Sequence, residues 1–200
     1  MNRQQHWESI YASKSDGDLS WTQPEPRLSL SLIEEVCPRG RIVDVGGGTS
    51  SLATRLLDAG YTVAVLDISE AALSHARMRV GSRGDEVRWI AADVTASPDL
   101  GTFDVWHDRA VFHFLTGPAD RAAYVARMAR TVSQGGHVVI ATFALDGPEK
   151  CSGLEVCRYD GRTLADTVGK EFSLLKSERE LHLTPPGKVQ PFQYSLFRRA

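Results

Sequence analysis

The sequence predicts an α/β fold: a doubly wound, mostly parallel seven-stranded sheet with an antiparallel strand near the C-terminus. Two observations predict it. Short apolar runs alternate with helical patterns from residue 41 onward, and a glycine-rich turn follows the first run. Strands separated by helices pair in parallel, because the crossover helix returns the chain to the same edge. Right-handed crossovers then place helices on both faces of the sheet.

The predicted elements alternate regularly through the middle of the chain. Strands are expected at 41–45, 61–66, 86–91, 103–106 and 138–143, and helices at 49–59, 70–80 and 119–132. In the first helix, Leu52 and Leu56 recur at helical spacing. Thr49 or Ser50 can cap its start, and Gly60 suits its end.

Two flanking segments depart from this alternation. Residues 1–30 look like a short helix followed by an irregular segment, and 172–183 and 190–197 look like two final strands. The turn at 184–187 between these strands holds two prolines that bar strand continuation. We therefore expect a closing antiparallel pair, and residues 1–200 are expected to form a single domain.

Composition places the chain among ordinary soluble globular proteins, with 42% apolar and 24% charged residues. A net charge of -2 gives no general attraction to nucleic acid or to an anionic membrane. The sequence shows neither an apolar signal core nor the roughly 20 apolar residues of a membrane-spanning helix. Three cysteines are too few for a disulfide framework. We expect a cytoplasmic protein that binds neither nucleic acid nor membrane.

The strongest local signal is the segment 42–50, in which a strand runs through three glycines into a helix. Glycines let the backbone approach a ligand closely, and the first helical turn offers free N–H groups. Asp67 ends the second strand, where a carboxylate is placed to accept hydrogen bonds from ribose hydroxyls. Asp93 ends the third strand, where it can accept from an adenine amino group. Each acid alone can equally cap a helix, but their order favours a nucleoside site.

Three kinds of ligand bind in such a crevice, and the glycine turn separates them. A nicotinamide site expects a third glycine or an alanine where Ser51 stands. A phosphate-binding P-loop expects a lysine after the glycines, and none is present. The third kind, a sulfonium nucleoside with an amino group, suits an acid two residues before the first glycine, as Asp44 is placed.

These motifs resemble those of small, single-domain class I S-adenosylmethionine-dependent methyltransferases. The resemblance rests on Asp44-Val-Gly-Gly-Gly48, Asp67, Asp93 and the late Gly135-Gly136, across about residues 40–145. It implies a Rossmann-like fold with 40–145 as the cofactor-binding core, S-adenosylmethionine as cofactor and S-adenosylhomocysteine as product. The cofactor residues that it implies are Asp44, Gly46, Gly47 and Gly48 near the methionine part, Asp67 and Ile68 near ribose, Asp93 and Val94 near adenine, and Asp108 and Trp21.

The acceptor is expected just beyond the fourth strand, at His107-Asp108-Arg109-Ala110. This segment is similar to the family segment that lines the methyl-transfer site, so Asp108 is a candidate general base. The alternative is that Asp108 caps a helix, with Arg109 as its solvated neighbour. The same motif is similar to thiopurine-type and protein-lysine methyltransferases alike and does not choose between them.

Three further side chains are catalytic candidates: His113 at a helical position, Cys151 in the loop after the fifth strand, and His182 near the end of the sixth. If that strand is parallel to the rest, His182 faces the same edge. Cys151 with either histidine would suit a soft acceptor such as a thiol or metalloid; simple packing and an ordinary loop thiol are the alternatives. The spacing matches no structural zinc pattern, so no metal site is expected.

The N-terminal segment 1–30 is expected to act as a lid over cofactor and acceptor. Trp7 and Tyr11 are one helical turn apart and share a face, and Trp21 follows. The alternative is an aromatic face docked on the domain, and both can hold.

The expected activity is methyl transfer by in-line displacement. Alignment of the acceptor alone can supply up to about 7–11 kcal/mol, and a base is needed only where the acceptor must lose a proton. A small-molecule acceptor is the leading prediction, and a protein-lysine acceptor is the alternative within the class. A non-catalytic S-adenosylmethionine-binding module and a nicotinamide oxidoreductase are the alternatives from other classes.

Overall fold

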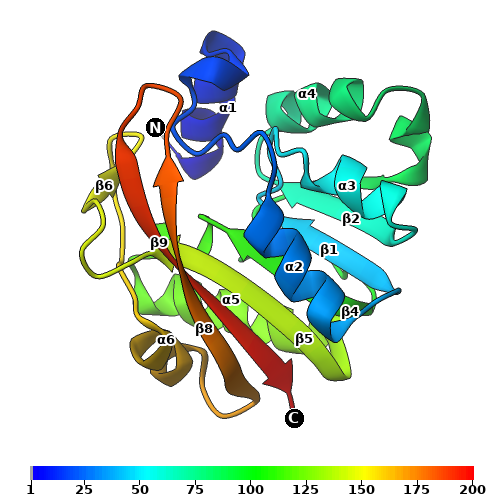
Figure 1. Ribbon diagram of the computed structural model, residues 1–200, viewed down its shortest axis with the longest axis vertical. Coiled ribbons are helices and arrows are strands. Elements are labelled where there is room, and N and C mark those ends of the chain that lie inside the picture. The colour runs from blue at the N-terminus through cyan, green and yellow to red at the C-terminus, as the bar shows by residue number, and fades with distance from the viewer. Residues whose placement is uncertain (1) are drawn as a thin grey trace.

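The computed structural model describes residues 2–200, and its centre is a seven-stranded sheet with helices packed on both faces (Figure 1). The strands are β1 (Arg41–Val45), β2 (Thr62–Asp67), β3 (Arg88–Ala91), β4 (Phe103–Arg109), β5 (Val132–Phe143), β6 (Lys150–Cys151), β7 (Leu154–Glu155), β8 (Phe172–Leu183) and β9 (Val189–Arg199). The α-helices are α1 (Arg3–Ser13), α2 (Arg27–Val36), α3 (Leu52–Asp58), α4 (Glu70–Val80), α5 (Pro118–Thr131) and α6 (Gly161–Val168). The short 3-10 helices are η1 (Asp16–Asp18), η2 (Gly81–Glu86) and η3 (Phe112–Phe114).

The strand order is β3-β2-β1-β4-β5-β9-β8. The strands from β3 to β5 pair in parallel, and β9 runs antiparallel between β5 and β8. This confirms the predicted mostly parallel sheet with a C-terminal antiparallel strand. In sequence order, β2 and β3 are added on one side of β1, and β4 and β5 are then added on its other side. In open parallel sheets, ligands bind at the carboxyl ends of the strands at such a reversal.

Several element bounds differ from those expected. The strand predicted to end at residue 106 continues as β4 to Arg109, so residues 107–109, expected to follow the strand, are part of it. The strand predicted from residue 138 already begins at Val132. Gly135 lies inside it with a φ of 73°, where the register against β4 shifts. The late glycines therefore form a bulge within β5, not a turn before it.

Three helices also depart from the sequence-based expectation. α3 begins only at Leu52, and the Ser50 hydroxyl accepts a hydrogen bond from the Leu52 N–H at 3.1 Å. α6 was not predicted. α2 was missed because leucines and serines alternate along 28–32, a strand-like period, whereas the buried residues Ser29, Leu32 and Ile33 follow helical spacing.

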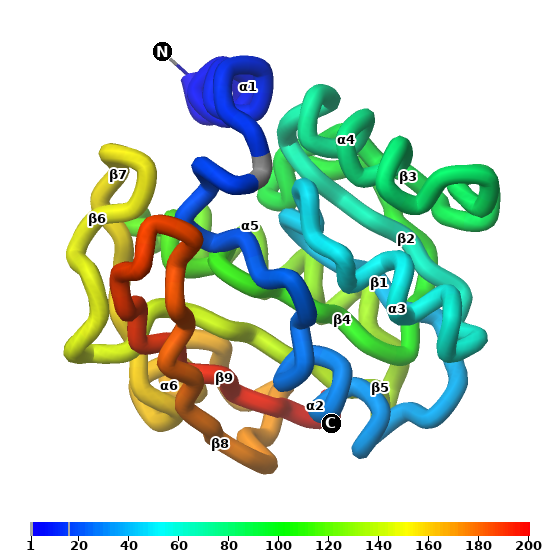
Figure 2. Tube along the Cα trace, turned by 45° about the horizontal axis from the view of Figure 1, so that its top comes forward, coloured from blue at the N-terminus to red at the C-terminus, as the bar shows by residue number. Residues whose placement is uncertain are grey.

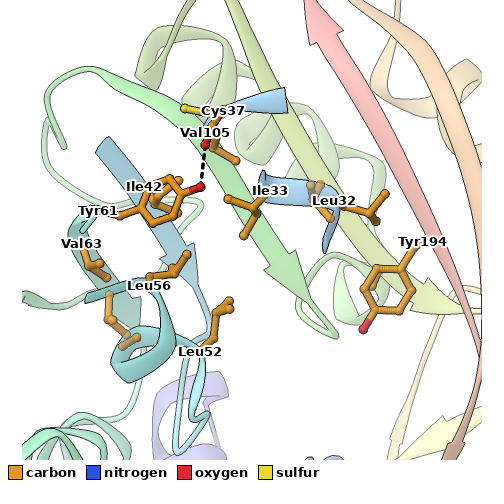
Figure 3. Packing of buried hydrophobic residues seen from close by; sticks show 14 of the residues in the cluster. Leu32, Ile33, Cys37, Ile42, Leu52, Leu56, Tyr61, Val63, Val105 and Tyr194 are labelled. Atoms are coloured by element: carbon orange, nitrogen blue, oxygen red, sulfur yellow. Dashed lines mark hydrogen bonds between the residues drawn. The ribbon is translucent and has the colours of Figure 1, made fainter. Parts of the chain in front are cut away.

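The core consists of two apolar layers, one on each face of the sheet. Along β1, Ile42 packs with α2 and α3 on one face, and Val43 packs with α5 and α6 on the other. Figure 1 shows α2 in front of the central strands and α5 behind them. Figure 3 shows the first layer, where the Tyr61 hydroxyl donates to the Cys37 carbonyl at 2.6 Å. Within residues 2–200, no helix is both long enough and apolar enough to cross a membrane.

The helix α1 lies apart from these layers. Figure 2 shows it above the sheet, joined to α2 by the segment 14–26, which descends past the central strands. Its N-terminus carries a capping box in which the Asn2 side chain accepts from the Gln5 N–H. The prediction for residues 1–30, a short helix followed by an irregular segment, agrees with the structure over residues 3–26, whereas residues 27–30 belong to α2 and residue 1 lies outside the described residues. The sequence pattern did not predict where this helix lies.

Replacing Leu56 by alanine is expected to lower the free energy of unfolding by about 2–5 kcal/mol, because it opens a cavity in a fully buried site. Urea unfolding followed by circular dichroism measures this loss. Leu175→Ala, which removes a half-exposed side chain from β8, is the matched control and should change stability by less than about 0.5 kcal/mol. Equal losses in the two variants would contradict the assigned packing.

Candidate functional site

A cleft of about 720 Å³, counting the part open to solvent, lies where the parallel strands end. One side consists of residues that end or follow β1, β2, β3 and β4, and the other side consists of residues from α1, Trp21 and Cys151. The lining residues are Arg3, Trp7, Tyr11, Trp21, Val45, Gly46, Leu66, Asp67, Ile68, Ala92, Asp93, Val94, Arg109, Ala110, Val111, Phe114, Leu115 and Cys151. The cleft therefore collects chain segments that are more than 100 residues apart.

The glycine turn between β1 and α3 packs tightly on both sides. Gly46 has a φ of 66°, and a Cβ there would lie 2.0 Å from Val111 Cγ2. Gly48 has a φ of 48°, and a Cβ there would lie 2.6 Å from the Tyr11 hydroxyl. These two positions need glycine because the backbone is left-handed and a neighbouring side chain leaves no room.

Asp67, the acid predicted to contact ribose, is buried and lines the cleft. Its Oδ2 accepts from the Gly48 N–H at 3.0 Å, and its Oδ1 accepts from the Ser69 N–H at 2.9 Å. Burial raises the pKa of this carboxyl to about 6, against the lowering effect of the two backbone donors. The side chain is thus held in one orientation, and it titrates close to neutral pH.

Asp93 also lines the cleft, but its carboxylate is engaged by the N-terminal helix. Asp93 Oδ2 lies 2.9 Å from Arg3 Nη1, and Arg3 Nη2 lies 2.6 Å from Asp120 Oδ2. Asp93 Oδ1 accepts from the N–H and hydroxyl of Thr95. An ion pair therefore ties α1 to the rim at the place where the sequence predicts an adenine contact.

Asp44 lines a second cavity of about 470 Å³, again counting the part open to solvent, that adjoins the cleft. Trp21 and Arg109 line both spaces, and Gly47 lines the second one beside Asp44. Asp44 Oδ1 lies 2.7 Å from His107 Nδ1, a partner that sequence analysis did not identify. The predicted acids therefore occupy two connected spaces.

Arg109 stands at the junction of the two spaces. Its Nη1 donates to the Trp21 carbonyl at 2.9 Å, its Nε donates to the Tyr194 hydroxyl at 3.0 Å, and its guanidinium lies 4.3 Å from the centre of the Phe192 ring. Among the described residues its Nη2 has no hydrogen-bond partner, although Glu180 Oε2 lies 3.8 Å away. The alternative of a solvated Arg109 is wrong, because its side chain is 11% exposed.

Asp108 lines neither space. Its carboxylate is fully buried and accepts from the Val111 and Phe112 N–H groups, at 2.9 and 3.0 Å, and from the Tyr124 hydroxyl at 2.5 Å. It thereby binds the N–H groups at the start of η3, and burial raises its pKa to about 6. Asp108 lines neither space because side chains alternate between the two faces of β4. His107 and Arg109 therefore point toward the cavities, and Asp108 points to the opposite face. The cap alternative describes Asp108, and the arrangement gives its predicted cofactor and base roles no support.

The other catalytic candidates do not converge in the cleft. His113 is fully buried, its Nδ1 accepts from the Phe143 N–H at 3.3 Å, and burial lowers its pKa to about 3. β8 is parallel to the central strands as expected, but His182 Nε2 contacts the Ser20 carbonyl at 2.7 Å. Cys151 lines the cleft, and burial raises the pKa of its thiol to about 11. Of these three, Cys151 alone reaches the cleft wall.

Four aromatic side chains form a wall over the cleft. The ring centres of Trp7 and Phe114 are 4.9 Å apart, those of Trp7 and Trp21 are 5.8 Å apart, and those of Tyr11 and Trp21 are 6.0 Å apart. Trp7 and Tyr11 lie on one face of α1, at the spacing that the sequence predicts. In the part of the chain that the structure describes, no group of three or more His, Cys, Asp or Glu side chains could hold a metal ion.

Known proteins that resemble this chain are methyltransferases. The profile of a family described as a methyltransferase domain matches residues 42–136. An eEF1A lysine and N-terminal methyltransferase of Danio rerio is 27% identical over 144 residues, which cover 70% of this chain and 21% of that protein. A ubiquinone biosynthesis O-methyltransferase of Thiobacillus denitrificans is 35% identical over 104 residues, 51% of this chain and 44% of that protein. The chain thus spans less than half the length of these two relatives.

Solved structures share the fold over nearly the whole chain. The N-methyltransferase NodS of Bradyrhizobium japonicum, in complex with S-adenosyl-L-homocysteine, superposes with a TM-score of 0.75 at 14% identity and covers 99% of both chains. A structure described as the conversion of a disulfide bond into a thioacetal group during echinomycin biosynthesis gives 0.77 at 20% identity, over 99% and 92% of the two chains. Because the family match falls on the segment that carries the glycine turn and the strand-end acids, residues 42–136 carry a methyltransferase domain, in keeping with the predicted resemblance to class I S-adenosylmethionine-dependent methyltransferases.

Proposed function

We propose that this protein transfers a methyl group from S-adenosylmethionine to a small-molecule acceptor by in-line displacement. The observation that carries the proposal is the cover over the cleft: α1 and Trp21 lie across the space that also contains the strand-end acids. An acceptor must therefore enter between aromatic rings. Concave, mostly apolar pockets with a few polar groups are typical of small-molecule sites.

The residues present fit the donor. Asp67 and Ile68 would hold the ribose, and Asp93 and Val94 would face the adenine, because these pairs line the main cleft. Asp44 lines the adjoining cavity, where its carboxylate would receive the α-ammonium of the methionine end. Arg109 Nη2 at the junction makes no hydrogen bond within the described residues, although Glu180 Oε2 lies 3.8 Å away, and it could donate to a carboxylate oxygen of the donor.

The protein's own contribution is binding and alignment. S-adenosylmethionine supplies an activated methyl group whose departure leaves a neutral thioether. The acceptor lone pair forms the new bond to the methyl carbon while the sulfur–methyl bond breaks, so the wall residues act by orienting the acceptor. Trp7, Trp21 and Phe114 restrict its approach and exclude water, and Cys151 offers a neutral thiol to the same space.

The N-terminal segment is proposed to act as a lid. Polar and aromatic contacts attach α1 to the rest of the protein. Arg3 pairs with Asp93, and Glu8 accepts from the Ala71 N–H. The Trp7 ring packs edge-on against Phe114. These contacts lie at the rim of the cleft, and the Arg3–Asp93 pair is only part-buried. An element attached in this way can open for donor entry without unfolding the sheet.

A protein-lysine acceptor is the second candidate, and it is favoured by the similarity to the eEF1A lysine and N-terminal methyltransferase of Danio rerio. A lysine side chain is narrow enough to enter the cleft, whereas the surrounding protein would have to dock outside α1. The covered cleft therefore favours the small-molecule acceptor.

Incubation with methyl-labelled S-adenosylmethionine and a fractionated lysate is expected to place label in the small-molecule fraction. Label on protein would support the lysine alternative. Tight S-adenosylhomocysteine binding without any labelled product would support a non-catalytic module. Calorimetry that shows binding of NAD but of neither S-adenosyl compound would refute the proposed function altogether.

Affinity for S-adenosylhomocysteine is expected to fall as the pH drops below about 6, where Asp67 becomes protonated. A neutral carboxyl loses charge-assisted acceptance of the ribose hydroxyls, so the loss should approach tenfold per pH unit well below that pKa. Calorimetry from pH 5 to 8 measures it. Asp67→Asn should bind weakly at every pH without this dependence; an unchanged slope in that variant would assign the titration to another group, such as Asp108.

Replacing Cys151 by serine is expected to abolish turnover of a soft acceptor, a thiol or metalloid, while leaving S-adenosylhomocysteine affinity unchanged. Serine keeps the side-chain shape but removes the polarisable sulfur from the cleft wall. Single-turnover assays with arsenite and with small thiols measure the effect. Cys157→Ser is the matched control, because Cys157 lines neither space. Normal turnover by the Cys151 variant would remove this residue from the mechanism.

A further inference from the structure

Three buried polar side chains, joined by hydrogen bonds, line the second cavity. Asp44 of β1 and His107 of β4 are register partners on neighbouring strands, and Asp44 Oδ1 lies 2.7 Å from His107 Nδ1. The other ring nitrogen, His107 Nε2, lies 2.9 Å from the Ser29 hydroxyl on the buried face of α2. Asp44 and His107 are 2% exposed and Ser29 is 0% exposed.

Burying these three polar side chains costs free energy that apolar side chains of similar size would not cost. Their presence in the core therefore points to a functional role. The partners at both nitrogens fix the histidine ring. A carboxylate only accepts hydrogen bonds, so Nδ1 carries a proton directed at Asp44, and the Ser29 hydroxyl engages Nε2. The ring cannot rotate without breaking both contacts.

The orientation of Asp44 follows from these contacts. With Oδ1 held by His107, Oδ2 is turned toward the glycine turn, where a Cβ on Gly47 would lie only 2.7 Å from it. Asp44, Gly47, His107 and Ser29 all line the second cavity. One carboxylate oxygen is thus anchored in the fold, and the other is left for a ligand.

We propose that His107 and Ser29 are positioning residues that hold Asp44 with one oxygen ready for the α-ammonium group of the methyl donor. The proposal rests on the proposed function, in which Asp44 receives that group. Neither His107 nor Ser29 takes part in methyl transfer itself. They act through Asp44, much as a second partner orients a metal-binding histidine.

The support extends to the cation of the same cavity. Arg109 Nε donates to the Tyr194 hydroxyl at 3.0 Å, and that hydroxyl donates to Glu180 Oε2 at 3.3 Å. Asp44 and Arg109 are therefore each held by a neighbouring side chain, Asp44 by His107 and Arg109 by Tyr194. This arrangement suits the two opposite charges of an α-amino acid group.

The test compares two ligands that share an adenosyl thioether but differ in the amino-acid tail. S-adenosylhomocysteine carries the α-ammonium, and 5′-methylthioadenosine does not. His107→Phe is expected to weaken S-adenosylhomocysteine binding by about tenfold or more, since it disturbs a charge-assisted hydrogen bond. Binding of 5′-methylthioadenosine should change less than about twofold, because Asp67 and the main cleft are untouched.

Two further kinds of variant distinguish a positioning role of His107 from a role in packing alone: one that restores the lost N–H group, and one that combines His107→Phe with a change at Asp44. His107→Asn places an amide N–H near the position of Nδ1 and is expected to recover most of the lost affinity. Ser29→Ala should show a weaker form of the same selective loss. Adding His107→Phe to Asp44→Asn should weaken S-adenosylhomocysteine binding no further, because the two residues act in series. His137→Phe changes a histidine of β5 that lines neither space, so this variant is the matched control and should bind both ligands normally.

The outcomes are distinguishable. Equal weakening of both ligands by His107→Phe, or unchanged binding of both, overturns the positioning role while leaving the proposed function intact. Additive losses in the double variant also overturn it. If the unmodified protein binds neither ligand, the proposed function itself fails. Melting temperatures of all variants, measured by circular dichroism, identify any that do not fold, and the asparagine variant then decides the outcome.

Discussion

The parallel pairing of β1 with β4 is the constraint on which the rest of the site depends. These strands are neighbours in the sheet although β2 and β3 lie between them in the sequence, so the chain order reverses at their junction. The helices that follow β1 and β4 leave in opposite directions, and a crevice opens at the carboxyl ends of both strands. The glycine turn enters this crevice from β1, and Arg109 enters it from the end of β4.

The pleat of β4 divides that strand between structural and functional roles. Trp106 and Asp108 point to one face, where both hydrogen-bond to the Tyr124 hydroxyl. His107 and Arg109 point to the other face and line the second cavity. Asp108 of the first pair also accepts from the N–H groups at the start of η3, whereas the second pair brings a ring and a guanidinium to the cavity wall. Adjacent residues of β4 therefore lie in different surroundings, one in the core and the next at the cavity wall.

The N-terminal segment completes the site from outside the sheet. Its aromatic side chains cover the cleft, Tyr11 closes on Gly48, and Arg3 binds the acid after β3. Its lower part continues into α2, which places Ser29 below the second cavity. One continuous stretch thus forms both the cover above the cleft and part of the support beneath the cavity. Trp21 of this segment lines both the cleft and the second cavity.

The sequence by itself determined the alternation of strands and helices, the glycine turn, and the strand-end acids Asp67 and Asp93. These are local features, since hydrophobic period and turn chemistry depend on residues close in the chain. Only the tertiary structure decided which side chains meet there. Asp44 and His107 are 63 positions apart, and the register of β1 with β4 alone makes them partners. Likewise, Asp108 turned to the core and Arg109 to the cavities because strand pairing fixed which face of β4 was buried against α5, a choice that no local pattern contains.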